Sequence, residues 1–552
     1  MNHQGVDVTS EGEASVADGH VAAVGAGPGD PELLTLRGAA LLERADVVFG
    51  LSEDEEMASF RDALLQHRGA NTRVLGPDEY GDDPDALAVA KAWEGKRVVR
   101  LYAGDPLLGG QVDNLADACR AAGVEFELAP GLSAALTVPS YAGIPLMANN
   151  ASETRLIDGS GDIAQLPGIE RQDTTLVVLN AQGEGDDPFF DRVTKPLVAA
   201  GRPTTTPIAV VRMGTTTKQT TVVSTLGKLA SALRSTDAKG HHVTRPATVI
   251  VGPGVRRQSD LTWFESRPLF GWRVLVPRTQ AQAAGLTEQL RGYGAVPEQV
   301  PTISVEPPRT PQQMERAVRG LVNGRYQWVA FTSTNAVRAI RERVEEYELD
   351  ARAFAGVRVA AVGEATADAL RDFGIEPDLM PAPETQSSTG LVEVWPPYDP
   401  ELDPIERVLL PRADIATETL SAGVQELGWA VDDVTAYRTV RAAPPPAPVR
   451  EAIKGGGFDA VLFTSSSTVR NLVGIAGKPH AATVIAVIGR ETEKTALEHG
   501  LRVDVVAERA SVASLAEGLA AFGTKRRQEA IDAGKPVLRP SQKRRGRRRK
   551  TV

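Results

Sequence analysis

The feature of this sequence that most constrains its fold is an internal repeat in the C-terminal half. Three sequence blocks, each a short aliphatic run followed by a helical pattern, occur twice in the same order. The two copies lie roughly 130 residues apart, which is the size of a domain rather than of a solenoid repeat. The positions that match between the copies are Pro277 and Pro411, Phe331 and Phe463, and Gly363 and Gly489. The repeat therefore predicts two copies of one α/β unit, with a ligand-binding cleft between the two lobes.

Hydroxyl side chains stand at the strand-to-helix junctions of both copies. The tripeptide FTS occurs at 331–333 and again at 463–465, and a glycine is followed three residues later by Thr366 in one copy and by Thr492 in the other. In an open α/β sheet such junctions lie beyond the carboxyl ends of the strands, where ligands bind. Serine and threonine at these places either cap the following helix or leave backbone N–H groups free for an anion. Four junctions in symmetric pairs favour a polyanion as the ligand.

The N-terminal half shows short aliphatic runs that alternate with helical patterns, which is typical of a further α/β unit. The run VAAV at 21–24 is followed by the glycine-rich turn GAGPGDP at 25–31. This turn lacks the GxGxxG spacing of a dinucleotide-binding loop, so on its own it indicates only a tight loop. We predict an α/β protein with globular units at 20–255 and 271–523, joined by a linker at 256–270.

Composition excludes several other classes of function. The single cysteine, Cys119, cannot form an intramolecular disulfide, and no Cys/His cluster has metal-ligand spacing. Because no apolar run reaches the ~18 residues of a membrane span and the N-terminus is polar and acidic, we expect a cytoplasmic protein that contacts no membrane. The net charge is −10, yet the residues from Lys525 onward are strongly basic. We predict disorder at 1–19 and 524–552; the basic tail is either a solvated extension or a polyanion-binding segment, and nothing else indicates nucleic-acid binding.

The second unit resembles the uroporphyrinogen-III synthases over about residues 271–520. The residues that carry the resemblance are the two FTS junctions, the VGEATA turn at 362–367 and the strand AYRTV at 436–440. The resemblance implies that the substrate is hydroxymethylbilane, a linear tetrapyrrole that bears acetate and propionate side chains. The hydroxyl would leave as water, the last pyrrole ring would be inverted through a spiro intermediate, and no cofactor would be needed.

The same resemblance implies the lobes and the site residues of the second unit. Two strands would join the lobes, so that lobe one comprises 271–304 and 438–523 and lobe two comprises 305–437. By position, Tyr437 matches the family's tyrosine near the hinge, which helps the hydroxyl to leave; the alternative is that Tyr437 only packs on a lobe. The other matching residues are Thr366, assigned with Tyr437 to catalysis, and Thr332, Ser333, Ser465 and Thr492, assigned to substrate binding.

The first unit resembles the tetrapyrrole methylases, specifically uroporphyrinogen-III C-methyltransferase, over about residues 20–255. The matching segments are GAGPGDPELLTL from residue 25, VVRLYAGDP at 98–106, APGLSA at 129–134, VPSYAGIPL at 138–146 and GRPTTTPIAVVRMG from residue 201. The resemblance implies a two-subdomain α/β unit that binds S-adenosylmethionine and methylates pyrrole carbons, and we expect this domain to form a dimer. The residues that it places around the cofactor are Pro28, Gly104, Asp105, Ser133, Ala134 and Gly214.

The first unit departs from that family pattern at groups that handle protons and substrate. Where the family has Tyr-Asp, this sequence has Phe49-Gly50, so the aspartate assigned as proton acceptor is missing, as is a lysine expected further along the chain. The family's Thr-His-Arg is MAN at 147–149, and its methionine near the cofactor is Asn180. A substitute base would have to come from the acidic stretch at 53–56, which is more typical of a solvated face.

Three hypotheses for function follow. In the first, the chain makes uroporphyrinogen III and its fused methylase converts this product to precorrin-2, on the way to sirohaem or cobalamin. In the second, the synthase is active and the methylase domain is catalytically degenerate, so that it only binds a ligand or stabilises the fusion. The third is a non-enzymatic, two-lobed ligand-binding regulator, although the sequence contains no helix-turn-helix pattern.

Overall fold

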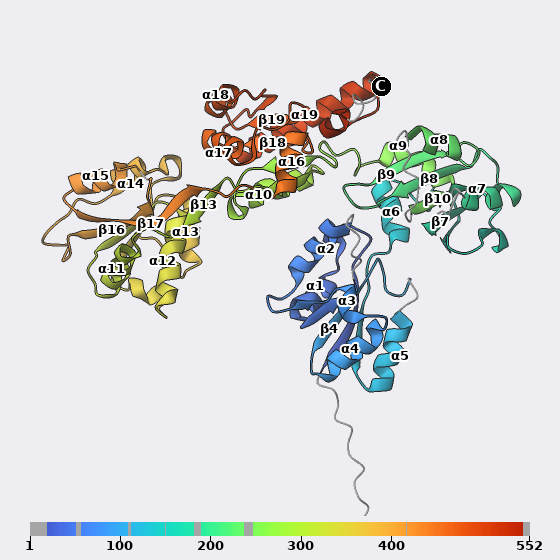
Figure 1. Ribbon diagram of the computed structural model, residues 1–552, viewed down its shortest axis with the longest axis horizontal. Helices are drawn as coiled ribbons and strands as arrows, with labels where there is room; N and C mark the ends of the chain where they lie inside the picture. Colours follow the sequence, from blue (N-terminus) through green and yellow to red (C-terminus); the bar gives the residue numbers. More distant parts are fainter. Residues whose placement is uncertain are drawn as a thin grey trace, which may run out of the picture. The chain divides into compact units, whose positions relative to one another are not determined.

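The computed structural model describes residues 19–50, 57–108, 112–148, 151–181, 189–236, 247–415 and 417–544 (Figure 1). Of the N-terminal segment 1–19 predicted to be disordered, all but Gly19 lies outside these ranges, as do the acidic stretch at 53–56 and the last residues, 545–552. By internal contacts the chain divides into two compact units. The first unit consists of residues 1–271 and 292–296, and the second of residues 272–291 and 297–552.

The first unit begins with a parallel sheet whose central strands are almost wholly aliphatic, because helices cover both faces. In spatial order its strands are β3 (Arg73–Val74), β2 (Val47–Phe49), β4 (Arg97–Tyr102), β1 (His20–Gly25) and β5 (Glu125–Ala129). The helices are α1 (Leu36–Arg44) and α2 (Ala58–Leu64) on one face, α4 (Pro84–Trp93) and α5 (Val112–Ala122) on the other, and the single turn α3 (Pro77–Tyr80). The carboxyl ends of β4, β1 and β5 therefore lie next to one another at one edge of the sheet.

A second, mixed sheet completes the first unit. In spatial order its strands are β6 (Glu153–Asp158), β7 (Thr174–Ala181), β10 (Ala247–Val251), β8 (Pro207–Arg212) and β9 (Thr220–Thr225). Its helices are α6 (Ala134–Ala142), α7 (Phe189–Ala199), α8 (Leu229–Thr236) and α9 (Gln258–Leu261). Helix α6 follows β5 of the first sheet, and its Val138 and Ala142 pack against Ala209 and Val211 of β8. The two-subdomain α/β unit predicted from the resemblance is confirmed.

The predicted linker at 256–270 is wrong in one respect, since this segment packs on the first unit instead of bridging two units freely. Phe264 and Leu269 are buried, and Phe264 stacks edge-on against Tyr141 with ring centroids 4.7 Å apart. The Glu265 carboxylate accepts a hydrogen bond of 2.9 Å from Gln219 Nε2. Apolar side chains at regular intervals thus hold the segment against α6.

The second unit contains two lobes, each built on a five-stranded sheet. The sheet of lobe one has the order β12 (Val296–Gln299), β11 (Arg273–Val276), β18 (Ala460–Phe463), β19 (Val484–Val487) and β20 (Val505–Val506). Its helices are α10 (Gln280–Gly292), α16 (Ala447–Gly455), α17 (Ser466–Ala476), α18 (Arg490–Glu498) and α19 (Val512–Asp532). Strands β11, β18, β19 and β20 of this sheet run parallel to one another.

Lobe two repeats this arrangement. Its sheet has the order β13 (Ile303–Glu306), β17 (Ala430–Arg441), β16 (Arg407–Ala413), β14 (Trp328–Phe331) and β15 (Arg358–Ala361). Its helices are α11 (Pro311–Val322), α12 (Thr334–Glu346), α13 (Glu364–Arg371), α14 (Ser388–Val394) and α15 (Thr419–Glu426). Helices α11 to α13 cover one face of the sheet, and α14 and α15 cover the other. The two α/β copies predicted from the repeat are confirmed.

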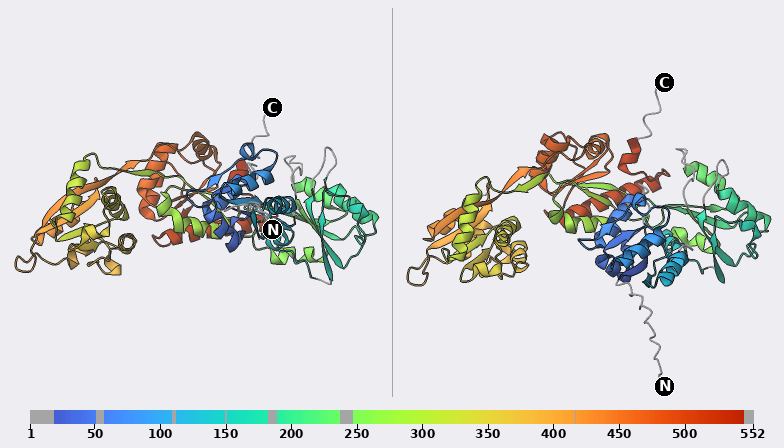
Figure 2. Two further views of the ribbon diagram at one scale, coloured as in Figure 1. Left: turned by 90° about the horizontal axis from the view of Figure 1, so that it is seen from below. Right: turned by 60° about the horizontal axis from the view of Figure 1, so that its bottom comes forward.

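The chain crosses between the two lobes on strands β13 and β17, which pair antiparallel (Figure 1, Figure 2). In this ladder Ile303 is opposite Arg441 and Glu306 is opposite Arg438, and the Arg438 guanidinium forms an ion pair of 2.6 Å with Glu306. The lobe boundary drawn at 304–305 falls within this ladder, and the one drawn at 437–438 falls at its end.

The prediction of disorder from residue 524 onward is wrong as far as residue 544. Helix α19 continues to Asp532, and a short helical turn at Pro540–Arg544 returns to lobe one. There the backbone N–H of Ser541 donates a hydrogen bond of 2.8 Å to Oδ1 of Asp459, whose other oxygen accepts from the Arg273 N–H at 2.9 Å. Asp459 is only 1% exposed, so this basic segment supplies one of the donors that a buried carboxylate needs.

Deleting residues 525–552 is expected to destabilise the second unit, whereas deleting only 545–552 should not. The longer deletion removes the Ser541 donor from the buried Asp459 carboxylate, at a cost of about 1–3 kcal/mol. Calorimetric unfolding should therefore show one transition lowered by several degrees in the longer deletion only. Identical unfolding temperatures for the two deletions would contradict the packing described for residues 525–544.

Candidate functional site

Three loops meet backbone to backbone at the carboxyl edge of the first sheet. Gly27 and Gly104 exchange two backbone hydrogen bonds, of 3.3 and 2.9 Å. A Cβ atom on Gly25 would lie 2.4 Å from the Gly131 nitrogen, and one on Gly131 would lie 2.1 Å from the Gly104 oxygen. The loops after β1, β4 and β5 can approach this closely only because glycine stands at the points of contact.

Asp105, predicted to bind the cofactor, holds two of these loops together. Its Oδ1 accepts a hydrogen bond of 3.0 Å from the Leu107 N–H, and its Oδ2 accepts one of 3.0 Å from the Gly131 N–H. Both carboxylate oxygens therefore bind backbone amides of the protein. Asp105 positions the loop after β5 relative to the loop after β4.

A loop of the second subdomain joins the same edge. Gly29 has φ +145° and lies so close to this loop that a Cβ atom on it would be 3.2 Å from the Gly214 oxygen. The next residue also contacts the loop, since the Asp30 N–H donates a hydrogen bond of 3.1 Å to Thr215 Oγ1. Thr215 has φ +66°, a conformation that is uncommon outside glycine, and its N–H donates to Gln219 Oε1 at 2.7 Å. Gly214 packs directly on Val138 of α6. The structure thus brings Gly214 to the turn that contains Pro28.

Tyr141 of α6 adds a further link between the subdomains. Its hydroxyl donates a hydrogen bond of 2.9 Å to Oδ2 of Asp30, and its ring packs on Trp263 and Phe264. Burial, together with the neighbouring Asp30 carboxylate, raises the pKa of Tyr141. The tyrosine therefore stays protonated and holds Asp30 in place.

The remaining predicted cofactor residues begin α6 at this edge. Ser133 is the N-cap, and its Oγ accepts a hydrogen bond of 3.1 Å from the Ala135 N–H. The Ala134 nitrogen lies 4.0 Å from where a Gly104 Cβ would be. The six residues predicted around the cofactor thus share one edge of the first unit, in a cradle made mainly of backbone.

The position that lacks the family's aspartate has a backbone suited to glycine alone. Gly50 has φ +100°, and a Cβ there would lie 2.6 Å from the Leu101 oxygen. Any side chain at this position would require the chain after β2 to move. The backbone at Gly50 would therefore have to change before this position could carry a carboxylate.

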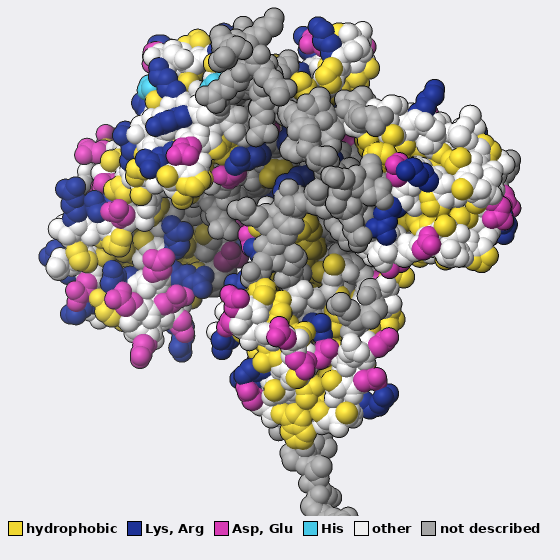
Figure 3. Space-filling view, turned by 45° about the vertical axis from the view of Figure 1, so that its right-hand side comes forward, with side chains coloured by type: hydrophobic (Ala, Val, Ile, Leu, Met, Phe, Trp, Pro, Cys, Tyr) yellow, Lys and Arg dark blue, Asp and Glu magenta, His cyan; other side chains and the backbone are white. Residues whose placement is uncertain are grey.

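Hydrophobic side chains are exposed on the loops after β4 and β5, in α6 and shortly after α6, a feature that the sequence analysis missed. These residues are Leu107, Leu108, Leu132, Leu136 and Met147. On the face shown in Figure 3, hydrophobic side chains are scattered among basic and acidic ones. The leucines after GDP are visible in the sequence, but whether a leucine is exposed depends on tertiary packing. Such side chains offer no hydrogen bonds to the carboxylates of a tetrapyrrole.

In lobe two the structure brings together two of the predicted residues. Ser333 follows β14 and caps α12, since its Oγ accepts a hydrogen bond of 3.2 Å from the Ala336 N–H. Tyr437 lies on β17, and its hydroxyl is 3.0 Å from Ser333 Oγ. Tyr437 is 7% exposed and packs in the same core as Phe331. It is therefore both a packing residue and a hydroxyl group held at the strand-to-helix junction.

The other predicted residues occupy matching positions in the two lobes. Thr366 and Thr492 lie in the first turns of α13 and α18 and are 6% and 4% exposed. Thr332 is half-buried beside Ser333. Ser465 caps α17 by accepting from the Thr468 N–H at 3.3 Å. Capping accounts for both serines, while Gly363 and Gly489 cap their helices without a side chain that could accept from the first-turn amides. That these junctions bind substrate stays a prediction.

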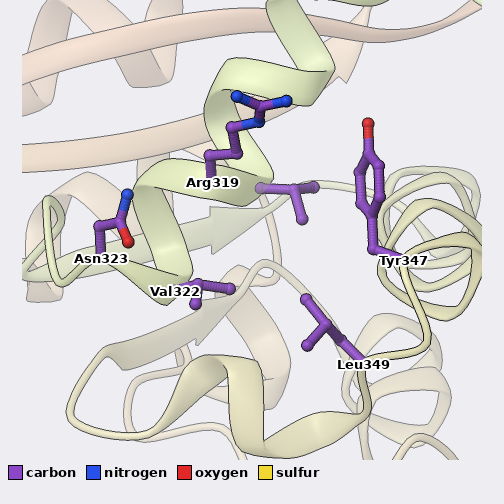
Figure 4. A pocket seen from close by; sticks show the side chains of 6 residues that line it. Arg319, Val322, Asn323, Tyr347 and Leu349 are labelled. Carbon is purple, nitrogen blue, oxygen red and sulfur yellow. The ribbon is translucent and has the colours of Figure 1, made fainter.

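Lobe two also has a cavity of about 230 Å³, which is lined by residues other than those predicted to form the site (Figure 4). It is lined by Val318, Arg319 and Val322 of α11, by Asn323, and by Tyr347 and Leu349 after α12. Arg319 is already paired with Glu315 at 2.7 Å. None of the predicted site residues lines this cavity.

Within the described ranges, three or more histidine, cysteine, aspartate or glutamate side chains never gather as a metal site would require. The same ranges contain no helix that is both long and apolar enough to cross a membrane.

Two family models match the chain. Residues 20–230 match the Tetrapyrrole (Corrin/Porphyrin) Methylases, and residues 284–517 match Uroporphyrinogen-III synthase HemD. The porphyrin biosynthesis protein HemD of Ruminiclostridium josui is 28% identical over 92% of this chain and 98% of its own length. The siroheme synthase of Azotobacter vinelandii is 34% identical, over 46% of this chain and 54% of its own length. The chain thus spans about half the length of that siroheme synthase.

Solved structures resemble each half separately. The uroporphyrin-III-C-methyltransferase of Thermus thermophilus covers 45% of this chain and 97% of its own, with 28% identity and a TM-score of 0.35. A mutant uroporphyrinogen III synthase of Thermus thermophilus covers 46% of this chain and 99% of its own, with 20% identity and a TM-score of 0.32.

Gly131→Ala is expected to destabilise the first unit, because its methyl group would lie 2.1 Å from the Gly104 oxygen, a backbone atom. Overpacking of this kind costs about 1–3 kcal/mol. The matched control is Gly161→Ala, at an exposed position where the nearest atom is 3.7 Å away. Chemical denaturation should show a lower midpoint for Gly131→Ala alone; an unchanged midpoint would mean that the three loops do not pack as described.

Proposed function

We propose that this chain, which carries a tetrapyrrole methylase domain and a uroporphyrinogen-III synthase (HemD) domain, closes hydroxymethylbilane to uroporphyrinogen III in its second unit. The last pyrrole ring would be inverted during this cyclisation. The observation that carries the proposal is the contact between Tyr437 and Ser333, because it places a phenol at a strand-to-helix junction of the matched domain. The relative that this chain spans almost completely is itself named a porphyrin biosynthesis protein.

The hydrogen bonds around Tyr437 favour a role as proton donor. Ser333 Oγ already accepts from the Ala336 N–H, so its own hydrogen is available to donate to the Tyr437 oxygen. The Tyr437 hydrogen is then free to be donated to the hydroxyl of the substrate, which departs as water. The resulting cation is attacked by an electron-rich pyrrole carbon, and loss of a proton from the closed ring restores its aromaticity.

In the first unit we propose that the carboxyl edge binds S-adenosylmethionine. The cradle fits such a ligand because a Cβ on Gly27 or Gly104 would meet no atom closer than 3.6 Å, so a ligand can approach the backbone there. Ser133 and the turn at Gly214 would border the same ligand. S-adenosylmethionine, when bound, supplies an electrophilic methyl group. At Gly50 the chain has no carboxylate to remove the proton that C-methylation releases.

The second candidate function, a degenerate methylase domain fused to an active synthase, is favoured by the edge of this cradle. Leu107 and Leu108, which follow Asp105 in the loop after β4, are exposed where a polycarboxylate substrate would need cations or hydrogen-bond donors. Binding of the cofactor then survives, while capture and methylation of uroporphyrinogen III are weak.

The direct test of the synthase is an isomer assay. Full-length chain is incubated with hydroxymethylbilane without S-adenosylmethionine, and the oxidised products are separated into type I and type III isomers. The proposal requires the type III isomer in excess. Type I alone, which arises spontaneously, would refute it and leave a non-enzymatic role.

Tyr437→Phe is expected to lower kcat for type III formation by about 100-fold, the contribution typical of a positioned proton donor. Its effect on stability should stay near ~1 kcal/mol, since a single hydrogen bond is lost. Tyr326→Phe is the matched control, because Tyr326 is equally buried in lobe two and donates to Asp432 at 3.0 Å. Equal rates for wild type and Tyr437→Phe would remove Tyr437 from the mechanism.

Calorimetric titration of the full-length chain with S-adenosylhomocysteine is expected to detect binding, while formation of precorrin-2 stays weak or absent. Binding depends on the glycine cradle, so Gly131→Ala should abolish it. Gly50→Asp should not restore methylation, because its Cβ would collide with the Leu101 oxygen. Robust precorrin-2 formation by the wild type would contradict this account of the first unit. So would the absence of any heat of binding at a saturating concentration of S-adenosylhomocysteine.

A further inference from the structure

An arginine without a counter-charge stands at the carboxyl edge of lobe one. Arg278 comes two residues after β11 and is half-buried. Among the described residues its guanidinium forms no ion pair or hydrogen bond. Burial lowers the pKa of Arg278, and no acidic neighbour opposes that shift. A half-buried guanidinium without a carboxylate partner of its own is available to pair with an anionic group of a ligand that reaches this edge.

The equivalent arginine of lobe two is already neutralised. The repeat that aligns Pro277 with Pro411 also aligns Arg278 with Arg412. Arg412 forms an ion pair with Asp433, in which its Nε donates at 2.7 Å, and its Nη1 donates to the Thr417 oxygen at 2.6 Å. Lobe one has no such arrangement among its described residues, because the carboxylate closest in alignment, Glu298, is paired with Arg273 at 2.7 Å.

A second pair of equivalent positions shows the same asymmetry. Arg490 follows Gly489 in lobe one, whereas Glu364 follows Gly363 in lobe two. Glu364 is paired with Arg371 at 2.7 Å. Arg490 is exposed and, within the part of the chain that the structure describes, has no carboxylate partner. At these two pairs of positions, lobe one therefore presents two unpaired cations and lobe two presents none.

The strand order fixes how far apart these two cations start. Arg278 follows β11 and Arg490 follows β19, and both strands are neighbours of β18 in the parallel sheet. Two strand spacings separate their backbones by roughly 10 Å. A single carboxylate cannot bridge that distance with ideal geometry at both ends. The spacing fits a ligand with several carboxylates, each bound by one guanidinium.

We infer that Arg278 and Arg490 form a carboxylate-binding site on lobe one that holds the acetate and propionate groups of the tetrapyrrole. This inference rests on the proposed function, which identifies the ligand as a tetrapyrrole. It assigns a different role to each lobe of the second unit. Lobe one binds the anionic side chains of the substrate, and lobe two supplies the Tyr437 hydroxyl for the reaction. Charge on lobe one also accelerates the encounter with a polyanionic substrate.

The test compares Arg278→Gln, Arg490→Gln and the double variant with wild-type full-length chain. Uroporphyrin is titrated by calorimetry at several salt concentrations, and KM for hydroxymethylbilane is measured alongside. Each single variant should weaken binding and raise KM about tenfold, and the double variant about 100-fold, since sites this far apart act additively. The salt dependence of binding should also become shallower in the variants.

Two control variants separate binding from folding. Arg412→Gln removes a paired arginine, so it should lower the unfolding temperature and leave uroporphyrin affinity unchanged. Arg278→Lys keeps the charge and should recover part of the affinity. Unchanged affinity, KM and salt dependence in the double variant would overturn the inference, as would a wild type that does not bind uroporphyrin. If the wild type binds uroporphyrin and the variants weaken that binding, but no type III isomer forms, the proposed reaction fails and the carboxylate site stands.

Discussion

Parallel pairing of neighbouring strands is the constraint on which both sites depend. Parallel strands end at the same edge, so loops that are far apart in the sequence must meet there. In the first unit this edge joins the loops after β1, β4 and β5, and three glycines allow their backbones to touch. In the second unit the same geometry operates twice, and it places Ser333 beside Tyr437 in lobe two and Arg278 beside the β18 junction in lobe one.

Two copies of one fold have acquired different chemistry at equivalent positions. The repeat aligns Tyr437 with Thr302, which is buried and donates to the Pro277 oxygen at 3.4 Å. Lobe one thus has a structural hydroxyl where lobe two has a phenol near a serine. The aligned arginines also differ. In lobe two Arg412 is paired with Asp433, whereas in lobe one the described residues provide no carboxylate for Arg278. Single residues at the strand ends thus distinguish two lobes that share one fold.

Sequence patterns predicted most of the fold because the aliphatic runs are buried on both faces and recur in register. The two lobes follow from the aligned blocks around Phe331 and Phe463, and the glycine-rich edge follows from GAGPGDP. Long-range partners could not be predicted in the same way. That the Asp105 carboxylate would bind backbone amides, and that Ser541 would donate to Asp459, depend on contacts between distant segments. Helix α19 continues to Asp532 although none of its residues after Gly523 is buried, so the polar, basic composition of this stretch led to a prediction of disorder.

The two units differ in how many of the groups that their proposed reactions need are present. In the second unit the Tyr437 hydroxyl lies 3.0 Å from its serine partner, and the half-buried Arg278 has no carboxylate partner among the described residues. In the first unit the loops of the cradle meet through glycine backbones, while Gly50 has no side chain and Leu107 and Leu108 are exposed after Asp105. A cradle made of backbone tolerates changes of side chain, so ligand binding can outlast catalysis.

The most direct measurement is a crystal structure of the full-length chain with uroporphyrin III bound. The account predicts carboxylates of the ligand within hydrogen-bond distance of the guanidinium groups of Arg278 and Arg490, with the Tyr437 hydroxyl against the macrocycle. A ligand whose carboxylates contact neither arginine, or that binds away from Tyr437, would contradict it.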